Sequence, residues 1–157
     1  HPIEIVAGGG SRFQSVRNGL RLVPDDAIVA IHDGVRPLVT TNVIKESFRL
    51  AAIHGSAISS VTLKESLRMV DVADEEKNRA VDRSRFRIIQ TPQTFQAGII
   101  RKAYNMDEDP ALTDDASVAE RSGHQVHLFD GHYENIKITT AEDMAIAAAI
   151  MDRTDSL

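Results

Sequence analysis

The sequence predicts an α/β fold formed by a single domain, and three observations support this prediction. Apolar clusters alternate with amphipathic stretches along the chain, which is typical of strands that alternate with helices. The length of 157 residues, with 42% hydrophobic and 26% charged residues, is ordinary for one globular domain. No internal repeat, low-complexity segment or linker divides the chain, so we expect residues 1–157 to form one unit.

The first third of the chain predicts two strands and two helices. A short strand is expected at residues 3–6, and Ser11 can cap the helix that follows the glycine turn. The continuous apolar run at residues 27–31 is typical of a strand that is buried on both faces. A helix is then expected at residues 42–54, with Gly55 as its stop.

The middle of the chain predicts a hairpin that protrudes from the domain. A third strand is expected at residues 57–63, and two strand-like pieces follow at residues 67–72 and 79–81. The acidic turn 73–76 separates these two pieces, and the charge density around it is too high for a buried core. We therefore expect an exposed β-arm at about residues 63–90.

The last third predicts three helices and two short strands. Thr94 and Thr113 are placed to cap two of the helices, and strands are expected at residues 125–129 and 135–138. Thr140 begins a segment close to a capping box, which predicts the start of the last helix.

Composition excludes several classes of function. The absence of cysteine removes disulfides, thiolate metal sites and a cysteine nucleophile. A net charge of −5 disfavours nonspecific binding to nucleic acid. No apolar run approaches the roughly 18–20 residues that a membrane span needs, so we expect no membrane partner. The absence of cysteine is compatible with a cytoplasmic location. His124, His127 and His132 lack the spacing of a zinc site, and we expect them to be structural or exposed.

The segment His32-Asp33-Gly34-Val35-Arg36-Pro37 is the first candidate site. It follows the predicted strand 27–31, and open α/β sheets bind their ligands beyond the carboxyl ends of strands. The carboxylate of Asp33 suits Mg²⁺ or a ribose hydroxyl, and the planar guanidinium of Arg36 suits a phosphate. The alternative is a tight turn closed by an Asp–Arg salt bridge.

The glycine turn at residues 7–11 is a second candidate, because it leads into a helix N-terminus that favours anions. It is not the dinucleotide fingerprint, since Phe13 stands where the third glycine should be, and it lacks the Lys-Ser/Thr of a P-loop. An ordinary strand-to-helix turn is the alternative, and a Rossmann-type dehydrogenase is disfavoured.

Four further motifs each have a structural interpretation. The acids of residues 113–117 could simply cap a helix. Lys137 could lie on the outer face of an exposed strand, or it could direct a compact cation at a phosphate. Residues 81–83 and 90–93 could be plain hairpin and loop segments.

The order of these motifs is more informative than any one of them. The succession is Gly8-Gly9-x-x-Arg12-x-x-Ser15-Val16, His32-Asp33-x-x-Arg36-Pro37, Val81-Asp82-Arg83, Thr91-Pro92-Gln93-x-Phe95, Thr113-Asp114-Asp115-Ala116-Ser117 and Asn135-Ile136-Lys137-Ile138-Thr139. It resembles the 2-C-methyl-D-erythritol 4-phosphate cytidylyltransferase family over nearly the whole chain. The resemblance implies a Rossmann-like nucleotidyltransferase sandwich with a mostly parallel mixed sheet and a protruding β-arm. It also implies cytidylyl transfer from CTP to a sugar-alcohol phosphate, with Mg²⁺ as cofactor, in cytoplasmic isoprenoid precursor biosynthesis.

The resemblance also implies roles for individual residues. Nucleotide binding falls to Gly8, Gly9, Ser15 and Asp33, with Asp33 also close to the metal-bound phosphates. Binding of methylerythritol phosphate falls to Arg36, Ser66, Arg83, Thr113 and Lys137, where Ser66 matches a position that is usually Thr. The catalytic set is Arg83, Lys137 and Asp33. In the family the β-arm reaches into the neighbouring subunit's site, so a homodimer is implied.

One departure from the family pattern is large. The family begins with a glycine-rich loop, including an Arg and a Pro-Lys pair, that wraps the triphosphate of CTP, and these 157 residues contain no counterpart. We expect roughly the family's first third to be absent from this chain, and the chain alone to be inactive or nearly so. The alternatives are a ribitol 5-phosphate cytidylyltransferase, which the motifs at residues 81–83 and 113–117 disfavour, and an inactive nucleotide-binding or dimerisation fragment.

Overall fold

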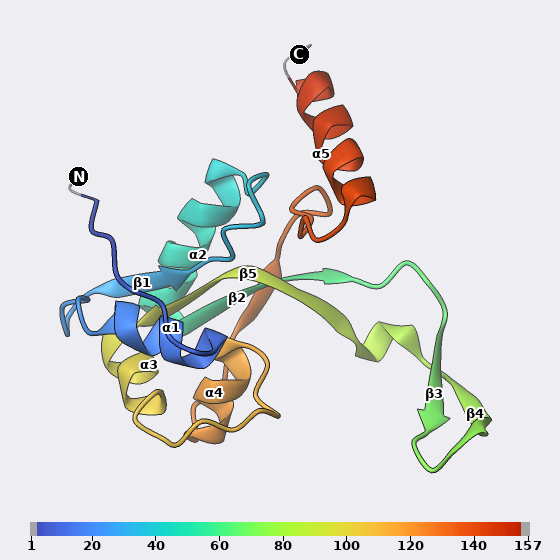
Figure 1. Ribbon diagram of the computed structural model, residues 1–157, viewed down its shortest axis with the longest axis horizontal. Helices are drawn as coiled ribbons and strands as arrows, with labels where there is room; N and C mark the ends of the chain where they lie inside the picture. The colour runs from blue at the N-terminus through green and yellow to red at the C-terminus, as the bar shows by residue number, and fades with distance from the viewer. Residues whose placement is uncertain (1–2, 155–157) are drawn as a thin grey trace.

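A computed structural model describes residues 3–154 of the chain (Figure 1). Its elements in chain order are α1 (Arg12–Leu20), β1 (Ile28–Ile31), α2 (Thr41–His54), β2 (Ser56–Thr62), β3 (Leu67–Asp71), β4 (Asp74–Val81), the 3₁₀ turn η1 (Arg83–Arg85), β5 (Arg87–Gln96), α3 (Ala97–Ala103), α4 (Asp115–Arg121), β6 (Leu128–Asp130) and α5 (Ala141–Thr154). Helices and strands are interspersed along the chain, so the predicted α/β class is confirmed.

Four strands form one mixed sheet in the order β1-β5-β2-β6. β5 pairs antiparallel with both β1 and β2, while β6 pairs parallel with β2. β1, β2 and β6 therefore share one direction and β5 opposes them, which confirms the mixed sheet that was expected, although two of its three pairings are antiparallel. Ile31 at the end of β1 pairs with Gln93, so the residues that follow β1 pass beside Thr91 of β5. This register determines where the first candidate site lies.

Helices cover both faces of this sheet (Figure 1). α1, α3 and α4 pack on one face, where Phe13, Ile58, Phe95 and Ile100 belong to the larger apolar cluster. α2 packs on the other face in a second cluster that includes Ala57 of β2. Ala57 and Ile58 are neighbours in one strand, and they serve opposite faces because successive strand residues point to opposite sides.

The predicted β-arm is present and projects away from the sheet (Figure 1). β3 and β4 form a separate two-stranded antiparallel sheet, with Leu67 paired with Val81. Residues 71–73 at its tip are exposed, with Val72 at 101% of its reference accessibility. An exposed hairpin agrees with the expectation, but residues 74–76 of the expected acidic turn belong to β4, and the turn lies at Val72 and Ala73.

Two of the strands expected from the sequence are absent. Residues 3–6 form no strand, and Ile3 and Ile5 are 91% and 97% exposed. A strand needs a hydrogen-bonding neighbour, and no strand in residues 3–154 pairs with this segment. Residues 135–138 are also not a strand; instead, the Ile138 N–H donates to the carbonyl of Val35 at 2.8 Å.

The helix ends expected from the sequence are partly corrected. Ser11 caps α1 by accepting from the Gln14 N–H, and Gly55 ends α2 with φ of 84°, as expected. Thr94 caps no helix: it is buried within β5 and donates to the hydroxyl of Ser47 at 2.9 Å. The cap of α4 is Asp114, one residue after the predicted Thr113.

α5 begins where the sequence predicted and stands out from the sheet (Figure 1). Asp143 accepts hydrogen bonds from the N–H groups of Thr139 and Thr140, both at 2.9 Å, at the start of this helix. Ala147 is buried, but Met144 and Met151 on the same apolar face are 60% and 54% exposed. None of the helices within residues 3–154 is long and apolar enough to cross a membrane.

Candidate active site

The loop after β1 holds Asp33 at the end of the sheet. The Asp33 N–H donates to the hydroxyl of Thr91 on β5 at 3.0 Å. The His32 ring shares a hydrogen bond with the same hydroxyl at 3.0 Å and contacts the carbonyl of Arg36 through its other nitrogen at 2.9 Å. These bonds fix the turn, and they leave the Asp33 side chain 17% exposed.

Three cations from three separate motifs surround the Asp33 carboxylate. Lys137 Nζ lies 3.4 Å from Oδ2, and Arg36 Nε lies 3.5 Å from the same oxygen. Arg12, from the start of α1, lies 3.9 Å from Oδ1. The expected convergence of Arg36 and Lys137 on Asp33 is therefore seen in the structure, although Arg36 also forms the local salt bridge that was the structural alternative.

Residues 135–138 place Lys137 beside Asp33 without forming a strand. Arg36 donates to the carbonyl of Asn135 at 2.8 Å, and the Asn135 side-chain amide donates to the carbonyl of Thr91 at 2.7 Å. Asn135 is fully buried at the centre of these contacts. The segment is thus tied both to the loop after β1 and to β5.

These side chains line one cavity of about 320 Å³. Its walls are formed by Arg12, Asp33, Arg36, Ile89, Gln90, Thr91, Gln93, Thr113, Asp114 and Lys137. Gln93 joins β5 to α4, because its amide donates to Asp114 at 3.0 Å and its carbonyl oxygen accepts from the Ala116 N–H at 2.8 Å. Thr113 is exposed at this wall, just before the helix.

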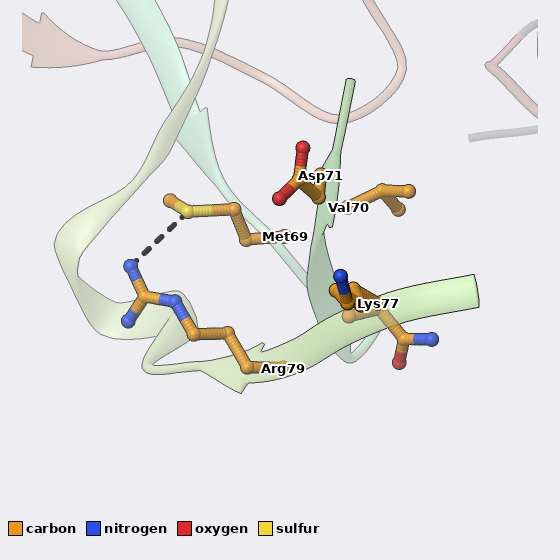
Figure 2. A pocket seen from close by; sticks show the side chains of 6 residues that line it. Met69, Val70, Asp71, Lys77 and Arg79 are labelled. Atoms are coloured by element: carbon orange, nitrogen blue, oxygen red, sulfur yellow. Dashed lines mark hydrogen bonds between the residues drawn. The ribbon is translucent and has the colours of Figure 1, made fainter. Parts of the chain in front are cut away.

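A hollow of about 400 Å³ lies on the β-arm, lined by Met69, Val70, Asp71, Lys77, Asn78 and Arg79 (Figure 2). Arg79 donates there to the sulfur of Met69 at 3.2 Å. This hollow is formed by one exposed hairpin, and it does not gather groups from several elements as the Asp33 cavity does. The Asp33 cavity is the better candidate for chemistry, because functional sites combine convergent polar groups from a rigid scaffold.

Five of the predicted site residues lie outside this cavity. In the glycine turn, the Gly9 N–H donates to Ser15 Oγ at 2.9 Å, so Ser15 closes the turn ahead of α1. Gly8 and Gly9 themselves are exposed. Ser66 and Arg83 belong to the β-arm, where Arg83 donates to the carbonyl of Lys64. Within this chain the structure does not bring Ser66 or Arg83 to Asp33.

Sequence reasoning missed an ion pair next to the cavity, in which Asp115 is fully buried and Arg12 is partly exposed. Arg12 donates to both oxygens of Asp115, at 3.0 and 2.7 Å, and the Tyr104 hydroxyl donates to the same carboxylate at 2.6 Å. Burial, together with the negative charge of Asp115, raises the pKa of Tyr104. Burial lowers the pKa of Arg12, but its bonds to Asp115 outweigh this and raise it overall. The signal available in the sequence was the pair of adjacent aspartates, Asp114 and Asp115, because a helix cap requires only one of them.

The described residues offer limited support for a metal ion. In residues 3–154 no group of three or more His, Asp or Glu side chains is placed to hold one. Both oxygens of Asp114 already accept protein hydrogen bonds, from Ser117 and Gln93. Of the two carboxylates that line the cavity, Asp33 is therefore the one that can offer an oxygen to a metal ion. One protein carboxylate suits Mg²⁺ if substrate phosphates and water supply the other ligands.

Comparison with known proteins agrees with the resemblance seen in the sequence. The profile of the 2-C-methyl-D-erythritol 4-phosphate cytidylyltransferase family matches residues 1–153. The protein of that name from Bacteroides thetaiotaomicron is 44% identical over 147 residues, which cover 94% of this chain and 66% of the relative. The one from Porphyromonas gingivalis is 46% identical over 148 residues, covering 94% and 65%.

Solved structures show the same fold. A 4-diphosphocytidyl-2C-methyl-D-erythritol synthase from Anaerococcus prevotii superposes with a TM-score of 0.82 at 27% identity, covering 92% of this chain and 66% of that one. The cytidylyltransferase from Thermus thermophilus gives 0.78 at 28% identity, covering 91% and 70%. The chain spans 66% and 65% of the length of the two curated relatives. On the profile match and on these identities, the chain belongs to the 2-C-methyl-D-erythritol 4-phosphate cytidylyltransferase family.

Proposed function

We propose that the protein transfers a cytidylyl group from CTP to 2-C-methyl-D-erythritol 4-phosphate. The products are 4-diphosphocytidyl-2-C-methyl-D-erythritol and pyrophosphate, in isoprenoid precursor biosynthesis. The observation that carries the proposal is the single cavity in which Arg12, Arg36 and Lys137 surround Asp33. Membership of the family supports the identity of the two substrates.

The chemistry of the step fits this cavity. A phosphate oxygen of the acceptor attacks the α-phosphorus of CTP, a new P–O bond forms, and the bond to pyrophosphate breaks. Two anions must approach one another while charge builds up on the transferring group. Such a step requires positioning and electrostatic stabilisation by fixed cations, and it needs no protein nucleophile. Arg36 and Lys137, which lie 3.5 and 3.4 Å from Asp33, would supply that stabilisation.

On the nucleotide side, we assign Gly8, Gly9, Ser15 and Asp33. The exposed glycines allow a ligand to approach the backbone closely, and Ser15 holds the turn in shape through the Gly9 N–H. Asp33 would hold the ribose or offer an oxygen to Mg²⁺ that is bound mainly by the CTP phosphates. The metal would neutralise the triphosphate and so favour attack on the α-phosphorus.

On the acceptor side, we assign Arg36, Thr113 and Lys137 of the cavity, together with Ser66 and Arg83 of the β-arm. The arm projects away from the sheet (Figure 1), and Ser66 and Arg83 do not line the Asp33 cavity of their own chain, so they would serve the cavity of a second copy in a homodimer. The apolar surface of the arm supports this, since Met69 and Val70 are 47% and 49% exposed beside the hollow of Figure 2.

The test of this function uses the complete gene product, because the chain spans about two-thirds of its relatives. We expect release of pyrophosphate from CTP with methylerythritol phosphate and Mg²⁺, and a product of the matching mass. Ribitol 5-phosphate serves as the competing acceptor and is expected to react much more slowly. A faster reaction with ribitol phosphate, or no release with either acceptor, would refute the assignment.

The 157-residue chain on its own is the second sample. We expect it to be inactive or nearly so, since it has no match to the family's triphosphate-binding loop. Binding of CTP without release of pyrophosphate would support its description as a nucleotide-binding fragment, and rapid turnover would contradict it. The cytoplasmic location stays a prediction, which cell fractionation would check.

A further inference from the structure

We propose that Arg12 is a further substrate-binding residue of the Asp33 cavity, and that Asp115 and Tyr104 are positioning residues that hold its guanidinium. The inference rests on the proposed function, because it adds a residue to the same site. The ligand group would be a phosphate oxygen, carried either by CTP or by the acceptor.

Arg12 is fixed by a clamp built from three helical segments. Its two terminal nitrogens reach the two oxygens of Asp115, at the start of α4, in the parallel geometry that suits a guanidinium and a carboxylate. Tyr104, at the end of α3, donates a third bond to that carboxylate. The side chain of Asp115 is fully buried, so its orientation is determined by these contacts.

The clamp leaves part of the guanidinium available. A guanidinium carries five N–H groups, and among the described residues two of those on Arg12 donate to Asp115. The side chain of Arg12 is 38% exposed and lines the cavity. Its 3.9 Å separation from Asp33 is too long for a hydrogen bond, so the remaining N–H groups can donate to a ligand in the cavity.

Charge separates the role of Arg12 from that of the other cations. Arg12 and Asp115 form a nearly neutral pair. Lys137 and Arg36, in contrast, are two cations beside one carboxylate, that of Asp33. Arg12 would therefore contribute directional hydrogen bonds more than net positive charge. A planar fork held at a fixed angle suits a phosphate whose orientation determines the line of attack.

The two adjacent aspartates of the fifth motif thus have separate tasks. Asp114 caps α4, accepting from the Ser117 N–H at 2.9 Å. Asp115 turns into the protein and clamps Arg12, which belongs to the first motif, 103 residues earlier in the chain. The clamp links the glycine turn to the wall that carries Thr113, and these are the parts assigned to nucleotide and acceptor.

The test compares binding by Arg12→Lys, Tyr104→Phe and the wild type in the complete gene product. CTP and methylerythritol phosphate are titrated separately by calorimetry, so that no turnover occurs. Lysine keeps the charge but loses the two-pronged bond, and we expect it to weaken binding of at least one ligand about tenfold, or roughly 1.4 kcal/mol. The ligand that loses affinity identifies the phosphate that Arg12 contacts.

Arg49→Lys is the matched control, because Arg49 forms a similar two-pronged pair with Glu46, at 2.8 and 2.6 Å, on α2 away from the cavity. It should bind both ligands within about twofold of the wild type. Tyr104→Phe retains the ring that packs 4.6 Å from Phe13 and removes only the hydroxyl, so we expect a loss of about threefold for the same ligand.

The outcomes separate this inference from the proposed function. If the wild type releases pyrophosphate and Arg12→Lys binds both ligands as tightly as the wild type does, the inference alone is overturned. If no transfer occurs but a phosphate ligand still depends on Arg12, the function fails and the binding role stands. If Arg12→Lys does not fold, unchanged binding by Tyr104→Phe overturns the clamp, and the expected threefold loss supports it.

Discussion

The ion pairs that meet at Asp33 are looser than the pair that holds Arg12. Lys137 and Arg36 lie 3.4 and 3.5 Å from the Asp33 carboxylate, whereas Arg12 approaches Asp115 to 2.7 Å. Distances beyond about 3.2 Å fall outside the usual range of a full N–H···O bond. Lys137 is also 49% exposed, so little is lost when its ammonium group moves from Asp33 to a phosphate. Loose cations are suited to a ligand that arrives and leaves in each cycle.

Lys137→Ala should therefore reduce turnover without affecting stability. We expect kcat/KM in the complete gene product to fall at least tenfold, or about 1.4 kcal/mol of transition-state stabilisation. The free energy of unfolding should change by no more than about 0.5 kcal/mol, because the side chain is half-exposed. Steady-state pyrophosphate release and urea unfolding provide the two measurements. Lys102→Ala, at an exposed position on α3, is the control, and an equal effect of both substitutions would contradict the role of Lys137.

At this scale the sequence could predict which residue types matter but not which of them pair. Asp33, Arg36 and Lys137 were recognisable because their motifs follow one another in the order of the family. Arg12 stood within such a motif, yet its role depends on Asp115 and on Tyr104, which lies outside every motif. Contacts across 103 residues are determined by the packing of helices, and no local pattern encodes them.

Among the elements, helix ends followed the sequence more closely than strands did. A cap is a local device, so Ser11 and Gly55 were placed correctly from their neighbours alone. A strand depends on a partner elsewhere in the chain, and residues 3–6 have no strand beside them among the described residues. Thr94 shows the same limit, because a threonine that could begin a helix is instead part of the strand β5.

Replacing glycines by alanine should separate backbone strain from steric conflict. Gly55 and Gly123 have φ of 84° and 90°, a region that costs a residue with a side chain about 1–2 kcal/mol. An added Cβ at Gly55 would also lie 2.7 Å from the end of the Ile99 side chain, whereas at Gly123 it would meet nothing within 4 Å. We expect Gly55→Ala to lower the free energy of unfolding more than Gly123→Ala does.

Gly19→Ala is the matched control for this pair, because it adds a Cβ within α1 with nothing inside 4 Å. It should raise the free energy of unfolding by about 0.5 kcal/mol, since alanine favours the helix. Urea unfolding of the three variants measures the order. A Gly123→Ala protein as stable as Gly19→Ala would show that left-handed strain is not what these positions require.

The start of α5 should respond to pH through Asp143. Hydrogen bonds from the N–H and hydroxyl of Thr139, and then from the N–H of Thr140, hold the pKa of the Asp143 carboxyl below its ordinary value. The charged form is thus favoured in the folded protein. Its contribution is present above the ordinary aspartate pKa of about 3.9 and is lost as pH falls through the lowered value.

Asp143→Asn should therefore reduce hydrogen-exchange protection at the first turn of α5 at pH 7, with the difference from wild type shrinking as pH falls toward 3. Amide exchange followed by nuclear magnetic resonance, and corrected for intrinsic rates, gives the comparison. Glu142→Gln is the control in the same turn, since Glu142 does not accept the hydrogen bonds from Thr139 and Thr140 that Asp143 accepts. A difference that persists unchanged at low pH would rule out the charge as the cause.

At the scale of the whole molecule, the sheet and the β-arm divide the proposed site residues between them. The sheet and its helices hold Asp33, Arg36 and Lys137 around one cavity. The arm projects away from the sheet (Figure 1), and its residues Ser66 and Arg83 do not line that cavity. An isolated two-stranded hairpin is only marginally stable in water, so the arm gains from a surface on which to dock. Exchange of arms between two copies would give each arm such a surface, and it would bring Ser66 and Arg83 to the cavity of the other copy.

Mixing two inactive variants tests this exchange. We expect Arg83→Ala and Lys137→Ala each to lose activity in the complete gene product. If Arg83 acts in the neighbouring cavity, a mixed dimer contains one site with both defects and one site with neither. Random exchange at equal amounts makes half of the dimers mixed, so activity should return to about a quarter of the wild-type value.

The same experiment distinguishes the alternative arrangement. If Arg83 acted within its own subunit, both sites of a mixed dimer would carry one defect, and mixing would restore nothing. Each variant refolded alone gives the baseline, and a mixture of wild type with Lys102→Ala shows that exchange itself does no harm. Recovery that depends on total protein concentration would further indicate that the intact site forms only when two copies associate, because each complete cavity then requires a second arm.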